Sequence, residues 1–237
     1  VEQVDVDRDG HAETVIASDA QWLMFSPGVG GALLEWDWRK RGVNVLNTLT
    51  RWREGYHQDL IDAAAKGEVV IAGQSHKLES IHTSVVKAKE PGLEKRLIVD
   101  WYRRSSLIDH VIAPDASSDA FYRASYAEWG DFVNQPYAVK VNRSAKKITL
   151  TLARDGGVWI DSVRHPLRIE KKITVESGQS AVAVAYTLTN MGEEKISARF
   201  GVETNWGISG GDATEGAYSL WPGGDLIRLN AIDAVPS

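Results

Sequence analysis

A chain of 237 residues is long enough to bury a substantial core, either in one large all-β domain or in two smaller ones. Its formal charge of -5 at pH 7 disfavours a nucleic-acid or anionic-membrane partner, and no apolar run is long enough to cross a bilayer, so we expect neither partner. The absence of cysteine excludes disulfides, thiolate catalysis and cysteine zinc sites.

The chain opens on an acidic loop, "DVDRDGHAE", that has the composition of a calcium-binding loop. Carboxylates alternate along it, and Gly10 allows a sharp turn before the last one. The loop is not an EF-hand, because Ile16 stands where the twelfth-position glutamate would be. We predict a structural Ca²⁺ site; the alternative is a solvated acidic turn with its corner at Asp9-Gly10. The predicted ligands are Asp5, Asp7, Asp9, Glu13 and, through its backbone carbonyl, His11.

Short β-branched or alternating runs, bounded by Gly, Asp, Asn and Pro, follow along most of the chain and predict antiparallel strands. One stretch, roughly 56–67, predicts a helix that ends at Gly67. No linker, low-complexity segment or repeat divides the chain, so we predict a single domain over residues 1–237: an all-β antiparallel super-sandwich with one short helix. The predicted strands are "ETVIASD", "QWLMFSP", "GGALLEWDW", "LEKRLIVDWY", "YAVKVNR", "KKITLTLAR", "LRIEKKITVE", "SAVAVAYTLTN" and "ISARFGVETN".

The clearest local prediction is a long hairpin over residues 167–190, turning at Ser177-Gly178. Strict alternation assigns one set of its side chains to the core. The predicted inward residues are Ile169, Ile173 and Val175 on one strand, and Val182, Val184 and Tyr186 on the other.

Three stretches place a carboxylate beside tryptophan: "LLEWDW", "YAEWGDF" and "FGVETNWG". Proteins often bind sugars in this way, because the aromatic ring packs against the apolar face of the sugar and the carboxylate accepts hydrogen bonds from its hydroxyls. A half-buried strand that alternates aromatic and charged residues would look the same. The predicted carbohydrate-binding residues are Trp36, Trp38, Trp129, Glu203 and Trp206.

The sequence contains no motif for zinc binding, phosphate binding or a serine hydrolase. The six histidines show no zinc-ligand spacing, no glycine-rich phosphate loop leads from a strand into a helix, and no Gly-x-Ser-x-Gly elbow is present.

Several of these stretches together resemble the carboxyl-terminal β-sandwich of glycoside hydrolase family 57, the 4-α-glucanotransferases and α-amylase-like enzymes. They are "VDVDRDGHAETVIASD", "PGVGGALLEWDWRKRGVNVLNTLTRWREGYH", "LIVDWYRRSSLIDHV", "AEWGDFVNQPY" and "FGVETNW". The resemblance implies a galactose-mutarotase-like fold.

In that family the catalytic glutamate and aspartate lie in an amino-terminal (β/α) barrel, for which this chain has no alternating βα pattern. The resemblance therefore implies a non-catalytic accessory domain. Its expected partners are its own amino-terminal barrel and an α-glucan. A chain that starts at Val1 fits an excised part of a longer enzyme, and cytoplasmic localisation is the default expectation.

Two alternatives remain at this point. The stretch from Gly201 to Asn205 also resembles the strand that carries the catalytic glutamate of aldose mutarotases, with Glu203 as the base and His110 or His165 as the acid. The other alternative is a purely structural interaction domain without a ligand.

Overall fold

Two antiparallel sheets account for most of the strands in the computed structural model, which describes residues 1–71, 86–88, 90–207, 218–220 and 226–228. The first sheet is a meander in chain order. Its strands are β1 (Glu2–Val4), β2 (Glu13–Ala17), β3 (Gln21–Ser26), β4 (Ala32–Trp38) and β5 (Val43–Asn44).

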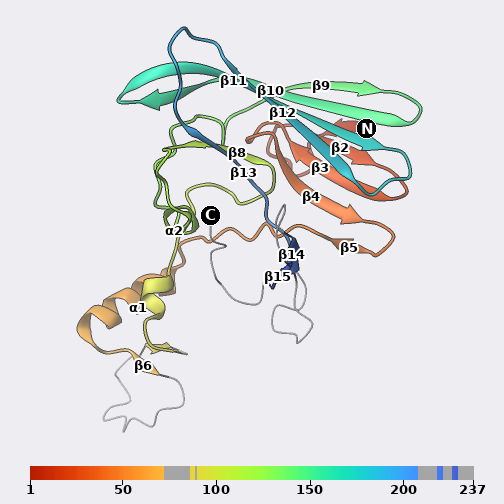
Figure 1. Ribbon diagram of the computed structural model, residues 1–237. Coiled ribbons are helices and arrows are strands. Elements are labelled where there is room, and N and C mark those ends of the chain that lie inside the picture. Colours follow the sequence, from red (N-terminus) through yellow and green to blue (C-terminus); the bar gives the residue numbers. More distant parts are fainter. Residues whose placement is uncertain (72–85, 89, 208–217, 221–225, 229–237) are drawn as a thin grey trace. The chain divides into compact units, whose positions relative to one another are not determined.

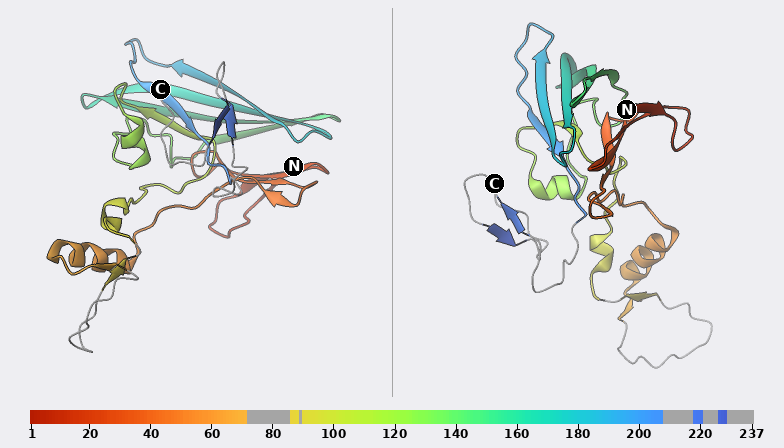
Figure 2. Two further views of the ribbon diagram at one scale, coloured as in Figure 1. Left: turned by 60° about the horizontal axis from the view of Figure 1, so that its bottom comes forward. Right: turned by 90° about the vertical axis from the view of Figure 1, so that its right-hand side faces the viewer.

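The second sheet has the order β12-β11-β10-β9 and carries the longest strands. They are β9 (Ala138–Arg143), β10 (Lys147–Ile160), β11 (Val163–Glu176) and β12 (Val182–Asn190). Figures 1 and 2 show β10 and β11 running across the sheet of β1 to β5. The buried side chains of the two sheets form one cluster, in which Ile16, Leu23 and Phe25 of the first sheet meet residues such as Leu152 and Ile169 of the second. The two layers are therefore a sandwich.

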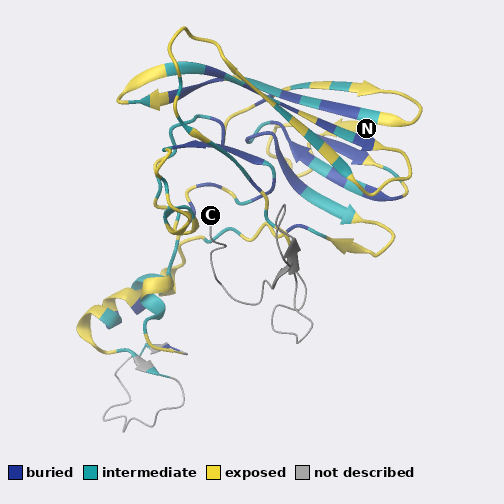
Figure 3. Cartoon of the chain, in the orientation of Figure 1, coloured by how far each residue is buried: buried dark blue, intermediate teal, exposed yellow. Residues whose placement is uncertain are grey.

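A third, two-stranded ladder of β8 (Ile108–Ile112) and β13 (Arg199–Glu203) adjoins both layers. An isolated bridge joins Leu33 of β4 to Ser106, just before β8, and another joins Gly130 to Val158 of β10. Every residue of β8 is buried, as the dark blue in Figure 3 shows. A short helix, α2 (Ser118–Tyr122), follows β8, and β14 (Tyr218–Leu220) pairs with β15 (Leu226–Arg228).

Contacts among the described residues group into two compact units: residues 1–49 with 102–237, and residues 50–101. The second unit contains α1 (Gly55–Lys66), a short parallel pair of β6 (Val70–Ile71) with β7 (Lys87–Ala88), and the 3₁₀ helix η1 (Leu93–Arg96). Inside it the buried Asp100 carboxylate accepts from the Arg51 backbone at 2.8 Å and pairs with the Arg51 guanidinium. The prediction of one folding domain over residues 1–237 stays a prediction.

The sequence predictions of the fold are largely confirmed. The protein is an all-β antiparallel sandwich, and α1 ends at Gly67, whose φ of 72° is the left-handed conformation that glycine adopts readily. In the predicted hairpin, Ile173 pairs with Val184 and Val175 with Val182, and all six predicted inward residues contact the core. The short helix α2 was not predicted.

The strand predicted over residues 93–102 is wrong. Gly92 has a φ of 77° and follows Pro91, so the chain turns, and the Lys95 amide donates to the Gly92 carbonyl at 3.1 Å to start η1. No helix among the described residues is long and apolar enough to cross a membrane.

A buried ion pair fastens the layers together. Lys171 lies at an inward position of β11, between Ile169 and Ile173, and its ammonium is 3.0 Å from the Asp109 carboxylate of β8. Both side chains are fully buried. The ammonium also donates to the carbonyls of Gly30 at 2.9 Å and Leu107 at 2.7 Å, and the Tyr137 hydroxyl donates to Asp109 at 2.7 Å.

The loop between β3 and β4 is shaped to receive this lysine. Gly30 and Gly31 have φ values of 67° and 53°, and a Cβ on Gly31 would lie 3.1 Å from the Lys171 side chain. Burial lowers the pKa of Lys171, and the Asp109 carboxylate opposes that shift. The sequence signal for this ion pair is Lys171 itself, a charged residue at an inward position of an alternating strand.

Replacing Lys171 with methionine leaves the Asp109 charge buried without its cation. We expect the Lys171→Met variant to lose about 3–5 kcal/mol of unfolding free energy in urea titrations. The double variant Lys171→Met with Asp109→Asn should recover part of that loss, because the uncompensated charge is gone. Lys172→Met, on the exposed neighbouring position, is the matched control and should change stability little. Equal losses in the Lys171 and Lys172 variants would contradict a fastening role for the ion pair.

Candidate functional site

Strand pairing brings His110 and Glu203 together. Gly201 of β13 is directly opposite His110 of β8, and Glu203 is opposite Ile108. Residues 201 and 203 face the same side of the strand, so His110 and Glu203 are diagonal neighbours on one face.

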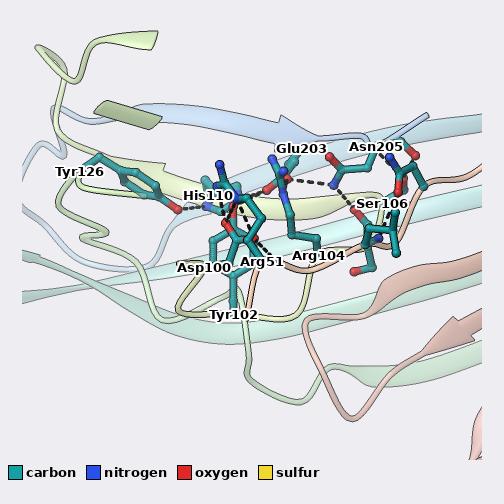
Figure 4. Close-up of polar contacts among 12 residues, drawn as sticks. Arg51, Asp100, Tyr102, Arg104, Ser106, His110, Tyr126, Glu203 and Asn205 are labelled. Carbon is teal, nitrogen blue, oxygen red and sulfur yellow. Dashed lines mark hydrogen bonds and ion pairs between the residues drawn. The ribbon is translucent and has the colours of Figure 1, made fainter. Parts of the chain in front are cut away.

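Glu203 accepts hydrogen bonds from four side chains. The Tyr102 hydroxyl donates to Oε2 at 2.6 Å, and the His110 Nε2 lies 3.1 Å from the same oxygen. The Asn205 amide donates to Oε1 at 2.8 Å, and the Arg104 Nε at 3.3 Å. Figure 4 shows this carboxylate between His110 on one side and Asn205 on the other.

His110 bridges two carboxylates. Its Nδ1 is 2.7 Å from Glu128, whose other oxygen accepts from the Val111 backbone at 2.8 Å. The Tyr126 hydroxyl also lies 3.2 Å from Nδ1, and Figure 4 shows it pointing toward the imidazole. Because each ring nitrogen faces a carboxylate, the geometry fits a doubly protonated imidazolium.

The ionisation of the site follows from these contacts. Burial alone would raise the pKa of Glu203, but the hydrogen bonds from His110, Tyr102 and Asn205 outweigh it and lower the pKa to about 2. For His110, burial alone would disfavour the charged ring and lower its pKa. The hydrogen bonds to Glu128 and Glu203 outweigh this effect, so the pKa of His110 is raised. Tyr102 has a raised pKa because it is buried beside the Glu203 charge.

A pocket of about 570 Å³ adjoins this network. His110 and Glu203 line it together with apolar residues of β8 and β13, and α2 contributes Phe121, whose ring packs edge-on against the imidazole at 5.1 Å. The Arg199 guanidinium, also in the lining, donates to the carbonyls of Pro114 and Ala116 at 2.6 Å each.

The arrangement is unsuited to acid–base catalysis. A general base needs a pKa near the working pH and a free oxygen aimed at its substrate. Glu203 has a pKa of about 2 and four donors on its oxygens, so it is a structural anchor. Glu128 and Glu203 both bond the intervening His110 ring, which fills the space that a scissile bond would need between two glycosidase carboxylates.

Of the predicted carbohydrate-binding residues, the structure brings Trp36 and Trp206 together. Their ring centroids are 5.7 Å apart and their planes are inclined by 53°. Trp38, two residues along β4, faces the same side as Trp36. Trp129 lies elsewhere, with its backbone bonded to Val111 and Trp159, and Glu203 turns inward to the His110 network.

Three predicted metal ligands also gather. Carboxylate oxygens of Asp5, Asp7 and Glu13 lie within 4.8 Å of one another. Asp9 is not in that group; its carboxylate accepts from the His11 backbone at 2.7 Å, as in a local turn.

Most of the buried network was not predicted from the sequence: local patterns do not indicate Tyr102, Arg104, Glu128 or Asn205, and they suggest His110 only as an acid. A signal existed in "SSLIDHV", where Asp109 and His110 interrupt an otherwise apolar strand. Polar residues inside a fully buried strand require partners, but the partners are distant in sequence.

Fold and site together define a β-sandwich domain whose buried ion pairs join β8 to β11 and to β13. The family model described as "Alpha-amylase/4-alpha-glucanotransferase, C-terminal" matches residues 5–231. The chain therefore belongs to this family, the glycoside hydrolase family 57 that its sequence resembles.

Relatives and a solved structure agree. The chain is 33% identical over 205 residues to the 4-alpha-glucanotransferase of Thermococcus litoralis and 30% identical over 203 residues to alpha-amylase 1 of Dictyoglomus thermophilum. These alignments cover 86% and 85% of this chain but 29% and 27% of the relatives. The crystal structure of the T. litoralis enzyme superposes with a TM-score of 0.67 at 28% identity, over 87% of this chain and 28% of that one.

The pH dependence of stability tests the network. With its raised pKa, His110 stabilises the fold fully below its unfolded value of about 6.5, and this contribution is lost as pH rises through the folded pKa. With its lowered pKa, Glu203 stabilises above its unfolded value of about 4.5, and this contribution is lost as pH falls toward about 2. The network should therefore stabilise most between about pH 4.5 and 6.5.

We expect His110→Gln to cost about 3 kcal/mol of unfolding free energy within that window and to flatten the decline at higher pH. Urea unfolding from pH 4 to 9 measures both effects. His165→Gln, a histidine outside the network, is the control and should keep the wild-type profile. A wild-type stability that rises between pH 6.5 and 8 because of His110 would contradict the assigned imidazolium.

Proposed function

We propose that this chain is the non-catalytic accessory domain of an enzyme that acts on α-1,4-glucans, and that it supports a catalytic barrel and binds carbohydrate. The observation that carries the proposal is the family match over residues 5–231, in relatives named as glucanotransferase and α-amylase that are several times longer than this chain. The four-donor environment of Glu203 supports the non-catalytic part. A mutarotase function has no comparable support.

Three tryptophans, Trp36, Trp38 and Trp206, support the carbohydrate-binding part of the proposal. Trp206 is 47% exposed and Trp38 is 37% exposed, although large apolar rings are ordinarily buried. Solvent-exposed aromatic rings that are fixed on a rigid sheet can stack against the apolar faces of sugars.

The direct test uses the 237-residue chain with maltoheptaose and soluble starch. Chromatography should show no hydrolysis or transfer products, whereas affinity electrophoresis in starch should show retarded migration. Mutarotation of glucose, followed by polarimetry, should not accelerate. New oligosaccharides would contradict the non-catalytic assignment. Unretarded migration of the folded protein would favour the purely structural alternative.

We also propose that the opening loop binds Ca²⁺ as a structural ion. Three carboxylates within 4.8 Å of one another repel unless a cation lies among them, and the Arg103 guanidinium comes only within 3.9 Å of Asp7. One Glu13 oxygen accepts from the Val6 backbone at 2.9 Å, which fixes this buried carboxylate toward the loop. Oxygen ligands of this kind fit Ca²⁺. Asp5, Asp7 and Glu13 would hold the ion.

Calcium that binds only the native loop should raise the melting temperature by mass action. At a hundredfold excess over its dissociation constant it should add about 2.7 kcal/mol of stability. The double variant Asp5→Asn with Asp7→Asn should melt at a temperature independent of Ca²⁺ and chelator, whereas the exposed control Glu193→Gln should respond as wild type. If wild-type melting is indifferent to chelator and to added Ca²⁺, the loop is only a turn.

A further inference from the structure

The Trp36–Trp206 pair is held in place by backbone contacts on both sides. Trp206 forms a bridge with Leu46, and the chain on either side of it is bonded to the same segment: Asn47 donates to Asn205 at 3.1 Å, and Gly207 donates to Val45 at 2.9 Å. A Cβ on Gly207 would lie 3.0 Å from the Leu46 carbonyl, so glycine permits this close approach.

Trp36 is equally constrained. It is paired with Leu23 of β3, its carbonyl accepts from Val45 at 2.9 Å, and its half-buried ring packs against the core. The 53° inclination between the two rings is therefore built into the strands, and a ligand would meet it already formed.

Trp38 lies beyond Trp36 on the same face of β4, because residues two apart on a strand are about 7 Å apart and face the same side. Trp206 lies in the other direction, across the segment 45–47 that is bonded to both Trp36 and residues 205–207. The Trp38 ring is 37% exposed and has the Arg41 guanidinium over it at 5.6 Å.

The inclination discriminates between linkages. An α-1,4 linkage turns each glucose relative to the last, so that the chain curves and successive apolar faces are tilted. A β-1,4 chain is a flat ribbon whose apolar faces lie parallel. Two rings inclined by 53° can each cover a glucose of a curved chain, but only one of them can lie flat on a ribbon.

We propose that Trp36 and Trp206 form a curved platform for two successive glucose units of an α-1,4-glucan, that Trp38 adds a third position, and that the platform discriminates against β-1,4-glucans. This inference rests on the proposed carbohydrate-binding function and names the ligand class and the residues.

Isothermal titration of the chain with maltotetraose and with cellotetraose tests it. Maltotetraose should bind at least about tenfold more tightly than cellotetraose, a difference of about 1.4 kcal/mol. Trp206→Ala should weaken maltotetraose binding about tenfold and remove the discrimination, whereas Trp206→Phe should retain most of both. Trp159→Ala, which removes an exposed tryptophan of the other sheet, is the matched control and should bind as wild type.

The outcomes separate this inference from the proposed function. Equal binding of the two tetrasaccharides, or maltotetraose binding that is unchanged in Trp206→Ala, would overturn the curved platform and leave carbohydrate binding standing elsewhere on the domain. Binding of neither sugar would overturn both. Because Trp206 is half exposed, Trp206→Ala removes little core, and its melting temperature confirms that the variant is folded before titration.

Discussion

The ammonium of Lys171, enclosed between the two sheets, depends on groups from several separate elements. It pairs with Asp109 of β8 and donates to the loop carbonyls of Gly30 and Leu107. A charge in a dry interior is tolerated only when such partners surround it, so each element must take its native position for the charge to be neutralised. The ion pair thereby fixes the long β10–β11 hairpin, β8 and the β3–β4 loop relative to one another.

Strand β8 connects this pair to the second polar network. Asp109 and His110 are adjacent and therefore point to opposite faces of the strand. Asp109 reaches Lys171 on the side of the sandwich core, and His110 reaches Glu128 and Glu203 on the side of the pocket. In both networks oppositely charged groups are paired: Lys171 with Asp109, and His110 with Glu128 and Glu203. Such pairing is the arrangement expected of a scaffold and not of a reactive centre.

The fold was predictable because its signals are local. Alternation along residues 167–190 identified the faces of β11 and β12, and Gly67 marked the end of α1. The failure at residues 93–102 was also local, since the turn at Gly92 overrode an apolar run.

The candidate site was only partly predictable because its contacts are not local. The Glu203–Tyr102 hydrogen bond joins residues 101 positions apart, and nothing in either neighbourhood indicates the other. The sugar-binding set was predicted from three stretches that place a carboxylate beside tryptophan, yet only the structure shows that Trp36 meets Trp206 while Trp129 does not. The family resemblance supplied the assignment that local patterns could not.

A domain built in this way is suited to hold a surface in a fixed shape beside a catalytic partner. Its rigid centre keeps the sheet edge, and with it the proposed sugar platform, in one geometry, so that little conformational entropy would be lost on binding. If the proposed glucan is a long chain, a supporting domain that also holds it would raise the local concentration of substrate.

The most direct test of the structural role of Glu203 is the protonation state of His110, followed by ¹⁵N nuclear magnetic resonance of the imidazole between pH 5 and 9. We expect both ring nitrogens to carry protons at pH 7, because the two flanking carboxylates raise the pKa of His110 above the ordinary value of histidine. A neutral His110 at pH 7, with one unprotonated nitrogen, would mean that Glu203 is not held by an imidazolium and would return it to consideration as a base.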